Sequence, residues 1–292
     1  MSRCTPASKH RCYATFLILT ITLLFGGCAK VPYQYGGLQE DRNMPVWRDT
    51  PQIETGQKNI ILDVLGNIYS LPSKLILLDW RIGNHNISPE TAKVLETYLQ
   101  ENDLNNVKVR INQYAPGAEW CRLFKNRSMN IFWRATFGLL STTIYTILPG
   151  RVFGGDNYNP YTNTISIYSD HPAILLHEGG HAKDLYNRPY KGLYSAIYVI
   201  PGVALWHEAE ATGDTIGYLR DKEQVADEKS AYRILYPAYG TYLGGALTDL
   251  FPVDLGPGYL IQLGVAIPGH LVGQIKAVTI DEKKPVRDET TD

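Results

Sequence analysis

The hydrophobic and polar positions between residues 59 and 280 follow strand spacing in some segments and helical spacing in others. Strand-like runs occupy residues 74–80 (KLILLDW), 107–112 (VKVRIN) and 164–168 (TISIY). Helical patterns cover roughly residues 88–104, 131–149, 171–187, 202–224 and 227–236. The pattern therefore predicts an α+β fold in which a small mixed sheet packs on helices, with an accessory helical region.

Residues 238–275 are apolar but are interrupted by many glycines and prolines. They predict short, closely packed buried helices, because an uninterrupted membrane span needs about 20 apolar residues. A surface that dips into a membrane is the alternative interpretation of the same segment.

The two ends of the chain differ from the middle. Basic residues Arg3, Lys9 and Arg11 precede a short apolar stretch at 14–25 and two glycines, which is the pattern of a secretory signal peptide over residues 1–27. An uncleaved anchor helix is the alternative. Residues 28–58 are polar and rich in glycine and proline, and are predicted to form a tether. The folded domain is predicted at 59–280, and 281–292 is a charged tail.

The sequence LFGGC at residues 24–28 resembles a bacterial lipobox. The resemblance implies that Cys28 carries a lipid and becomes the mature N-terminus. It implies a membrane partner through this lipid and a place in the bacterial cell envelope. Ala29 after the cysteine favours the outer membrane, with the protein facing the periplasm.

Composition narrows the function further. The chain has 28 basic and 29 acidic residues, so it lacks the basic surface that nucleic-acid binding requires. Of the four cysteines, Cys4 and Cys12 lie in the predicted signal and Cys28 is the predicted lipidation site. Cys121 then has no partner, so the sequence predicts no intramolecular disulfide.

The most informative motif is His-Glu-Gly-Gly-His at residues 177–181, within a predicted helix that Ser169 or Asp170 could cap. Positions i and i+4 lie on one face of a helix, so His177 and His181 can bind one zinc ion. Glu178 is then placed to take a proton from the attacking water. Gly179 and Gly180 are unfavourable in a helix, and indicate close packing of another backbone, passage of substrate, or simple tolerance.

A catalytic zinc needs a third protein ligand, which the next predicted helix can supply. Glu208 and Glu210 are two positions apart and point in nearly opposite directions, so one of them can face the metal. Glu210 is favoured because Asp214 follows it at i+4, where a carboxylate could support a ligating histidine. Glu208, with Thr212 at i+4, is the alternative ligand.

This combination resembles the gluzincin metallopeptidases. Within them the closest pattern is Glu-x-Glu-Ala-Asp-x-Ile-Gly, from the membrane-associated family of the CAAX prenyl protease and the mitochondrial overlapping-activity protease. Glu210, Asp214, Ile216 and Gly217 match it, whereas Thr212 and Gly213 depart from it. The resemblance covers roughly residues 160–220.

The resemblance implies a zincin-like fold and a zinc-dependent peptidase acting on a polypeptide substrate. Glu178 would be the general base, and His177, His181 and Glu210 would hold the metal with Asp214 behind them. The strand at 164–168 would be the edge on which an extended substrate lies. His207, Tyr218 and His270 are candidates for stabilising the oxyanion.

Two other functions stay open on the sequence. The departures at Thr212 and Gly213 are compatible with an envelope lipoprotein that binds or chaperones other proteins and has little peptidase activity. Zinc sites also hydrolyse substrates other than peptides.

Overall fold

Four short strands form one mixed sheet in the order β1-β2-β4-β3. The strands are β1 (Ile53–Thr55), β2 (Lys108–Ile111), β3 (Asn157–Asn159) and β4 (Thr164–Ile167). The first three in sheet order run parallel, and β3 pairs antiparallel with β4. The structure is a computed structural model that describes residues 28–36, 51–200, 202–250 and 255–280.

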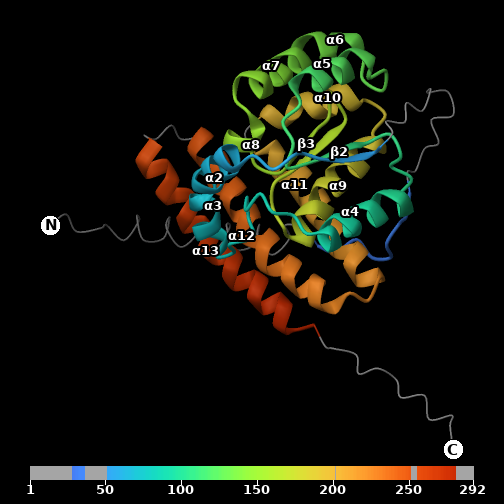
Figure 1. Cartoon of the computed structure of the whole chain (residues 1–292). Helices are drawn as coiled ribbons and strands as arrows, with labels where there is room; N and C mark the ends of the chain where they lie inside the picture. Colours follow the sequence, from blue (N-terminus) through green and yellow to red (C-terminus); the bar gives the residue numbers. More distant parts are fainter. Residues whose placement is uncertain (1–27, 37–50, 201, 251–254, 281–292) are drawn as a thin grey trace, which may run out of the picture.

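Helices surround this sheet (Figure 1). Those that precede the histidine motif are α2 (Ile60–Tyr69), α3 (Leu71–Leu77), α4 (Pro89–Glu101), α5 (Pro116–Lys125), α6 (Ile131–Trp133), the π-helical turn η1 (Arg134–Gly138), α7 (Leu139–Ile147) and α8 (Gly150–Phe153). The rest are α9 (Pro172–Tyr186), α10 (Lys191–Ala196), the 3-10 turn η2 (Ile197–Val199), α11 (Val203–Asp221), α12 (Val225–Leu250) and α13 (Leu255–Val278). The predicted α+β class with a small mixed sheet is confirmed.

One face of the sheet carries the main hydrophobic core. Val109 and Ile111 of β2 and Ile165 and Ile167 of β4 alternate along their strands and are buried. They share one cluster with apolar side chains of α4 and α9, including Leu95, Leu99, Leu175 and Leu176. This core holds α9, the helix of the histidine motif, against the sheet.

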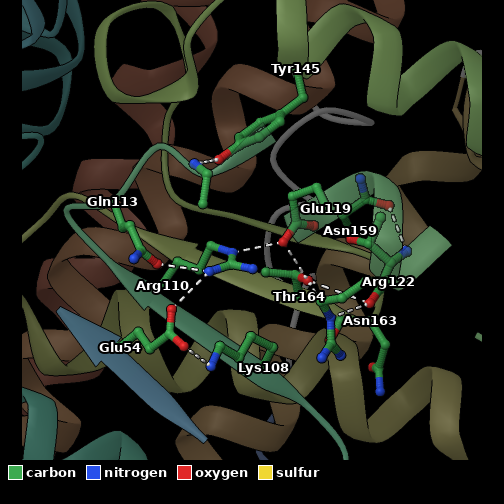
Figure 2. A network of polar contacts seen from close by, with 12 residues as sticks. Glu54, Lys108, Arg110, Gln113, Glu119, Arg122, Tyr145, Asn159, Asn163 and Thr164 are labelled. Carbon is green, nitrogen blue, oxygen red and sulfur yellow. Dashed lines mark hydrogen bonds and ion pairs between the residues drawn. The ribbon is translucent and has the colours of Figure 1, made fainter. Parts of the chain in front are cut away.

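The opposite face of the sheet is polar, yet it is buried under α5. Arg110 of β2 is 2% exposed and donates to Glu119 of α5 at 2.7 Å and to Glu54 of β1 at 3.1 Å (Figure 2). Lys108 donates to the other oxygen of Glu54 at 2.6 Å. The alternation in residues 107–112 thus marks a strand with one apolar face and one ionic face, and both faces are buried. The ionic face can be buried because each of its charges has a partner of opposite sign.

Several predicted elements are wrong. Residues 74–80, predicted as a strand, belong mostly to α3, where Pro72 lies in the first turn and Lys74 is buried with its Nζ near Gly83 O at 3.1 Å. Strand β3 (Asn157–Asn159) was not among the predicted strands. β4 is therefore an inner strand, and the predicted substrate edge at 164–168 is occupied by β3.

The glycine-rich C-terminal region forms two long helices in place of the predicted short ones. α12 continues to Leu250, well beyond the predicted end at 236, and α13 packs beside it. Glycines lie at the contact: a Cβ on Gly240 would meet Val265 O at 2.6 Å, and one on Gly273 would meet Tyr232 O at 2.3 Å. The glycines therefore allow close helix packing, and their helix-breaking tendency is overcome by burial.

The predicted tether is also partly wrong, because its two described parts are built into the fold. Residues 28–36, here called the N-terminal segment, lie against α11, where Lys30 N donates to Gly213 O at 3.0 Å. A Cβ on Gly213 would stand 2.6 Å from Cys28 O. Glycine at position 213, where the sequence departs from the resembled pattern, thus leaves room for the N-terminal segment to pack against α11. β1 also lies within the predicted tether, and the predicted signal at 1–27 and tail at 281–292 lie outside the described residues.

Exposed apolar side chains gather on α2, α3 and α13. They include Ile60, Ile61 and Leu75 on the first two helices, and Leu260, Ile267, Leu271 and Ile275 on α13. None of the described helices alone meets the length and hydropathy expected of a membrane span, although α2 and α3, bent by 48°, meet them as a pair.

The Glu54 contact predicts a pH-dependent stability. The hydrogen bond from Lys108 lowers the pKa of Glu54 below its usual value. The ionised Glu54 carboxylate therefore stabilises the fold at pH values above its unfolded-state pKa, and this stabilisation is lost as the pH falls through its folded-state pKa. We expect Glu54→Gln to lower the free energy of unfolding by about 1 kcal/mol at pH 7 in urea titrations. The difference should shrink toward pH 3.

The matched control is Glu96→Gln, which removes an exposed pair with Lys93 on α4. It should change the free energy of unfolding by less than about 0.5 kcal/mol at either pH. An equal loss for Glu54→Gln at pH 7 and pH 3 would contradict the ionic role of Glu54.

Candidate metal centre

Three side chains from two neighbouring helices converge at one point. His177 and His181 project from α9, and Glu208 projects from α11. His177 Nε2 lies 3.0 Å from Glu208 Oε2 and 3.1 Å from His181 Nε2. His181 Nε2 lies 3.5 Å from Glu208 Oε1. Each residue offers one ligand atom within 4.8 Å of the others.

These separations fit a small tetrahedral cation. Ligand atoms placed 2.0–2.1 Å from zinc at tetrahedral angles are about 3.3 Å apart, which lies within the observed range. Two imidazole nitrogens and one carboxylate oxygen are a zinc donor set that leaves one position open. The residues present therefore fit a zinc ion.

The structure corrects the choice between the two glutamates. Glu208 faces the histidines. The alternative prediction, Glu208, therefore agrees with the geometry, and the favoured prediction, Glu210, is wrong. Glu210 points toward the N-terminal segment, where its Oε2 lies 3.0 Å from Lys30 Nζ. The two positions differ by about 200° around the helix, so only the position that faces α9 can join the pair.

Asp214 is likewise not behind the histidines. It accepts from Tyr98 at 2.5 Å and from Tyr33 at 3.2 Å, and its other oxygen lies 2.9 Å from Lys183 Nζ. The position behind His177 is taken by Thr212, whose Oγ1 lies 3.5 Å from His177 Nδ1. The carboxylate that faces the histidines is Glu208, two residues before the favoured Glu210. The residue four positions after it is therefore Thr212 and not Asp214.

The two glycines of the motif are explained by close packing on both sides of α9. A Cβ on Gly179 would lie 2.7 Å from the Tyr98 ring of α4, and one on Gly180 would lie 3.0 Å from Ala211 O of α11. Glycine at 180 thus lets the backbone of α11 approach, which brings Glu208 within reach of the histidines. Close packing of another backbone, one of the predicted alternatives, is what the structure shows at Gly180, whereas Gly179 faces the side chain of Tyr98.

The start of α9 also differs from the prediction. His171 is the capping residue, and its Nδ1 accepts from Ala173 N at 3.2 Å. Asp170 instead accepts from Ser88 N at 3.0 Å, at the start of α4. Ser169 donates to Asp156 and accepts from Gly83 N at 2.7 Å. These contacts join the starts of α4 and α9, and so fix the direction in which His177 and His181 project.

Burial and charge set the protonation of the centre. Burial raises the pKa of Glu178 to about 8, while the charge of His181 opposes this shift. Burial alone would lower the pKa of His181, but the Glu208 carboxylate raises it to about 9. Burial alone would raise the pKa of Glu208, but His181 and His177 hold it well below its usual range. Burial thus favours the protonated form of the Glu178 carboxyl group.

A cavity of about 380 Å³ opens beside this centre, and Glu178, His181 and Glu208 line it. Tyr198 of η2 also lines it and donates to Glu208 Oε1 at 2.6 Å. This hydrogen bond fixes the carboxylate, as a supporting partner of a metal ligand does. No sequence signal pointed to Tyr198, because it is one of 20 tyrosines and lies in a segment without a motif.

Of the three oxyanion candidates, the structure brings His207 alone to the cavity. Tyr218 donates to Glu101 at 2.8 Å, and His270 contacts Ile76 O at 2.7 Å, both away from the centre. Asp184 lines the cavity, accepts a hydrogen bond from Tyr194 and pairs with Arg188 at 2.5 Å.

Comparisons with known proteins add no assignment: no family model, curated protein or solved structure matches this chain. The geometry of the centre and the sequence motifs are therefore the observations that bear on function.

The two glutamates predict different effects on metal binding. We expect Glu208→Gln to weaken zinc binding by about tenfold to a hundredfold or more in chelator competition, because a carboxylate ligand is lost. Glu210→Gln should bind zinc as the wild type does, since Glu210 contacts Lys30 instead. The opposite order would show that the ligand is Glu210.

The glycines predict opposite effects on stability at two sites. Gly179→Ala should lower the free energy of unfolding by about 1–3 kcal/mol, because the new Cβ collides with Tyr98. Gly264→Ala, in α13 with open space around its Cβ, should raise it by up to about 1 kcal/mol. Urea titrations measure both, and a stabilised Gly179→Ala protein would contradict the close packing.

Proposed function

We propose that this chain is a zinc-dependent peptidase with a zincin-like arrangement, resembling the membrane-associated gluzincins. The observation that carries the proposal is the convergence of His177, His181 and Glu208 beside a cavity that also contains Glu178. The three donors and an adjacent buried carboxyl group are the components that metal-assisted hydrolysis requires.

The chemistry divides between the ion and the chain. Zinc in such a site supplies a Lewis acid, which polarises a carbonyl group and lowers the pKa of water. Glu178 takes the proton of the attacking water and passes it to the leaving nitrogen, since its carboxyl group lines the cavity beside the three donors. Tyr198 keeps the Glu208 carboxylate in place during these steps.

The substrate strand has a place to bind along β3. This strand pairs with β4 on one side and has no second strand partner in the described part of the chain. Asn157 and Tyr158 of β3 line the same cavity as Glu178. An extended peptide added to the outer edge of β3 would therefore pass along the centre.

The proposal includes attachment to the bacterial envelope through a lipid on Cys28. The supporting observations are the lipobox-like sequence before Cys28 and the exposure of the Cys28 side chain. The N-terminal segment binds α11 directly after this cysteine, so the peptidase would be held close to the outer membrane.

Metal content and proteolysis together test the function. The full chain, purified in detergent, should contain one zinc and should cleave an unfolded protein such as casein. Glu178→Gln should retain zinc and lose activity by about 10²–10⁴-fold, whereas His177→Ala should lose the zinc. Folded wild-type protein that binds no zinc would refute the proposal, as would full activity in Glu178→Gln.

A deletion strain separates the peptidase from a binding lipoprotein. If the envelope phenotype of the deletion is restored by the wild-type gene and not by Glu178→Gln, hydrolysis is required. Full restoration by Glu178→Gln would favour the binding or chaperone role.

A further inference from the structure

Exposed apolar side chains form a stripe along α13. They recur at helical spacing and lie within about 120° of one another around the helix, since each residue advances by about 100°. The stripe consists of Leu260, Leu263, Ile267, Leu271, Ile275 and Val278, each at least 37% exposed. The opposite side of α13 packs on α12, where a Cβ on Gly269 would meet Tyr236 O at 2.6 Å. The stripe therefore points away from the core.

Helices α2 and α3 carry further exposed apolar side chains beside this stripe. They are Ile60, Ile61, Val64, Leu65, Ile68 and Tyr69 of α2, and Leu71 and Leu75 of α3. His270 of α13 donates from Nε2 to Ile76 O of α3 at 2.7 Å, so α3 lies against the middle of α13 (Figure 1). The exposed apolar side chains of the three helices are here called the apolar face.

The apolar face has no charged side chain among the exposed positions of the described parts of α2, α3 and α13. Asp63 is paired with Arg151 at 2.6 Å, and Lys74 is buried. Lys276 lies on the side of α13 that faces α12, over the ring of Tyr232. A helix on the surface of a soluble protein normally has charged and polar residues on its exposed side. Their absence indicates that the face meets an apolar phase.

The composition of the apolar face fits a lipid bilayer better than a protein partner. Its residues are mainly Leu, Ile and Val, which partition into hydrocarbon, whereas the centres of protein interfaces are enriched in Tyr, Trp and Arg. α2 and α3 together meet the length and hydropathy of a membrane span, although they are bent by 48°. Trp80, which follows α3 and is 67% exposed, is of the residue type that gathers at the boundary between lipid and water.

The predicted lipid attachment point lies at one end of the same face. Cys28 lines a cavity together with Thr279 and Ile280, which follow the C-terminal end of α13. Ile275 of the stripe lies in the last turn of this helix. A chain held to a membrane at Cys28 would therefore have α13 close to lipid.

We propose that the apolar face of α2, α3 and α13 docks onto a lipid bilayer, with α13 parallel to the membrane surface. A helix that lies in this way buries its apolar side about 5–10 Å into the boundary between headgroups and acyl chains. The three helices lie outside residues 160–220, which carry the resemblance to the gluzincins. The inference goes beyond the proposed peptidase function, since it requires neither zinc nor a lipid on Cys28.

Spin labels measure which surface of the chain meets lipid. In the full chain, Cys4, Cys12, Cys28 and Cys121 are replaced by serine, and a single nitroxide-labelled cysteine is introduced. The chain is reconstituted in phosphatidylcholine vesicles, and relaxation of the label by oxygen is compared with relaxation by a water-soluble nickel complex. We expect the oxygen-to-nickel ratio to be at least about fivefold higher for Ile267→Cys and Leu75→Cys than for Lys93→Cys, because the nickel complex is excluded from hydrocarbon. Lys93, on α4, is the exposed control position.

A charged substitution tests whether the helices act as one surface. Adding Leu271→Glu to the Leu75→Cys chain should lower the ratio at position 75 by about twofold or more, because an ionised carboxylate is unfavourable in lipid. Tyr190→Glu is the matched control, since Tyr190 is 76% exposed and lies outside the apolar face. It should leave the ratio at position 75 unchanged. All labels are compared on the same attached chain, so attachment through its N-terminal residues does not affect the result.

Three results would each overturn the inference. The first is an equal ratio at positions 267, 75 and 93. The second is a label on α13 or α3 that neither reagent reaches, because a second copy of the chain or another protein then covers the face. The third is a ratio at position 75 that Leu271→Glu does not change. Zinc content and proteolysis are measured separately, so each of these results leaves the proposed function standing.

Discussion

The candidate centre depends on the close contact between α9 and α11. The histidines are fixed relative to each other by one helix, but the carboxylate must come from another helix at a defined depth. Gly180 makes this possible, because any side chain there would press on the Ala211 backbone. The resulting pair of helices places Glu208 Oε2 3.0 Å from His177 Nε2. Glycine at position 180 is unfavourable for the helix itself, but it is required for the close approach of α11 that forms the site.

The far side of α11 is held as firmly as the side that faces the histidines. The N-terminal segment lies across Gly213 and Gly217, and Tyr33 from this segment shares Asp214 with Tyr98 of α4. Lys183 of α9 also pairs with Asp214 at 2.9 Å. Asp214 thus connects the N-terminal segment, α4 and α9 around α11, and does not contact the candidate metal ligands. Asp214, which was expected to support a histidine, instead supports the helix that carries the candidate third ligand, Glu208.

The buried polar face of the sheet helps to position the helices that line the cavity. Arg110 and Glu119 attach α5 to β2, and α5 packs against α7, which lines the cavity beside the centre. A buried network of this kind is stable only when its charges are paired, so it restricts α5 to one position. The sheet therefore positions the ligand helix on one face and, through α5, the cavity wall on the other.

The sequence by itself determined the elements whose signals are local: helix α4 after Ser88, strands β2 and β4, the α+β class, and the placement of two histidines on one face of α9. It could not choose between Glu208 and Glu210, because that choice depends on which side of α11 meets α9. The sequence pattern also misassigned residues 74–80 and 238–275. An apolar run was taken for a strand in the first segment and glycines for helix breaks in the second, whereas packing against other elements makes both segments helical. Only the tertiary structure decided the candidate third ligand, the contact of Tyr198 with Glu208, and the docking of residues 28–36. Each of these depends on contacts between segments far apart in the sequence, and local periodicity carries no information about such contacts.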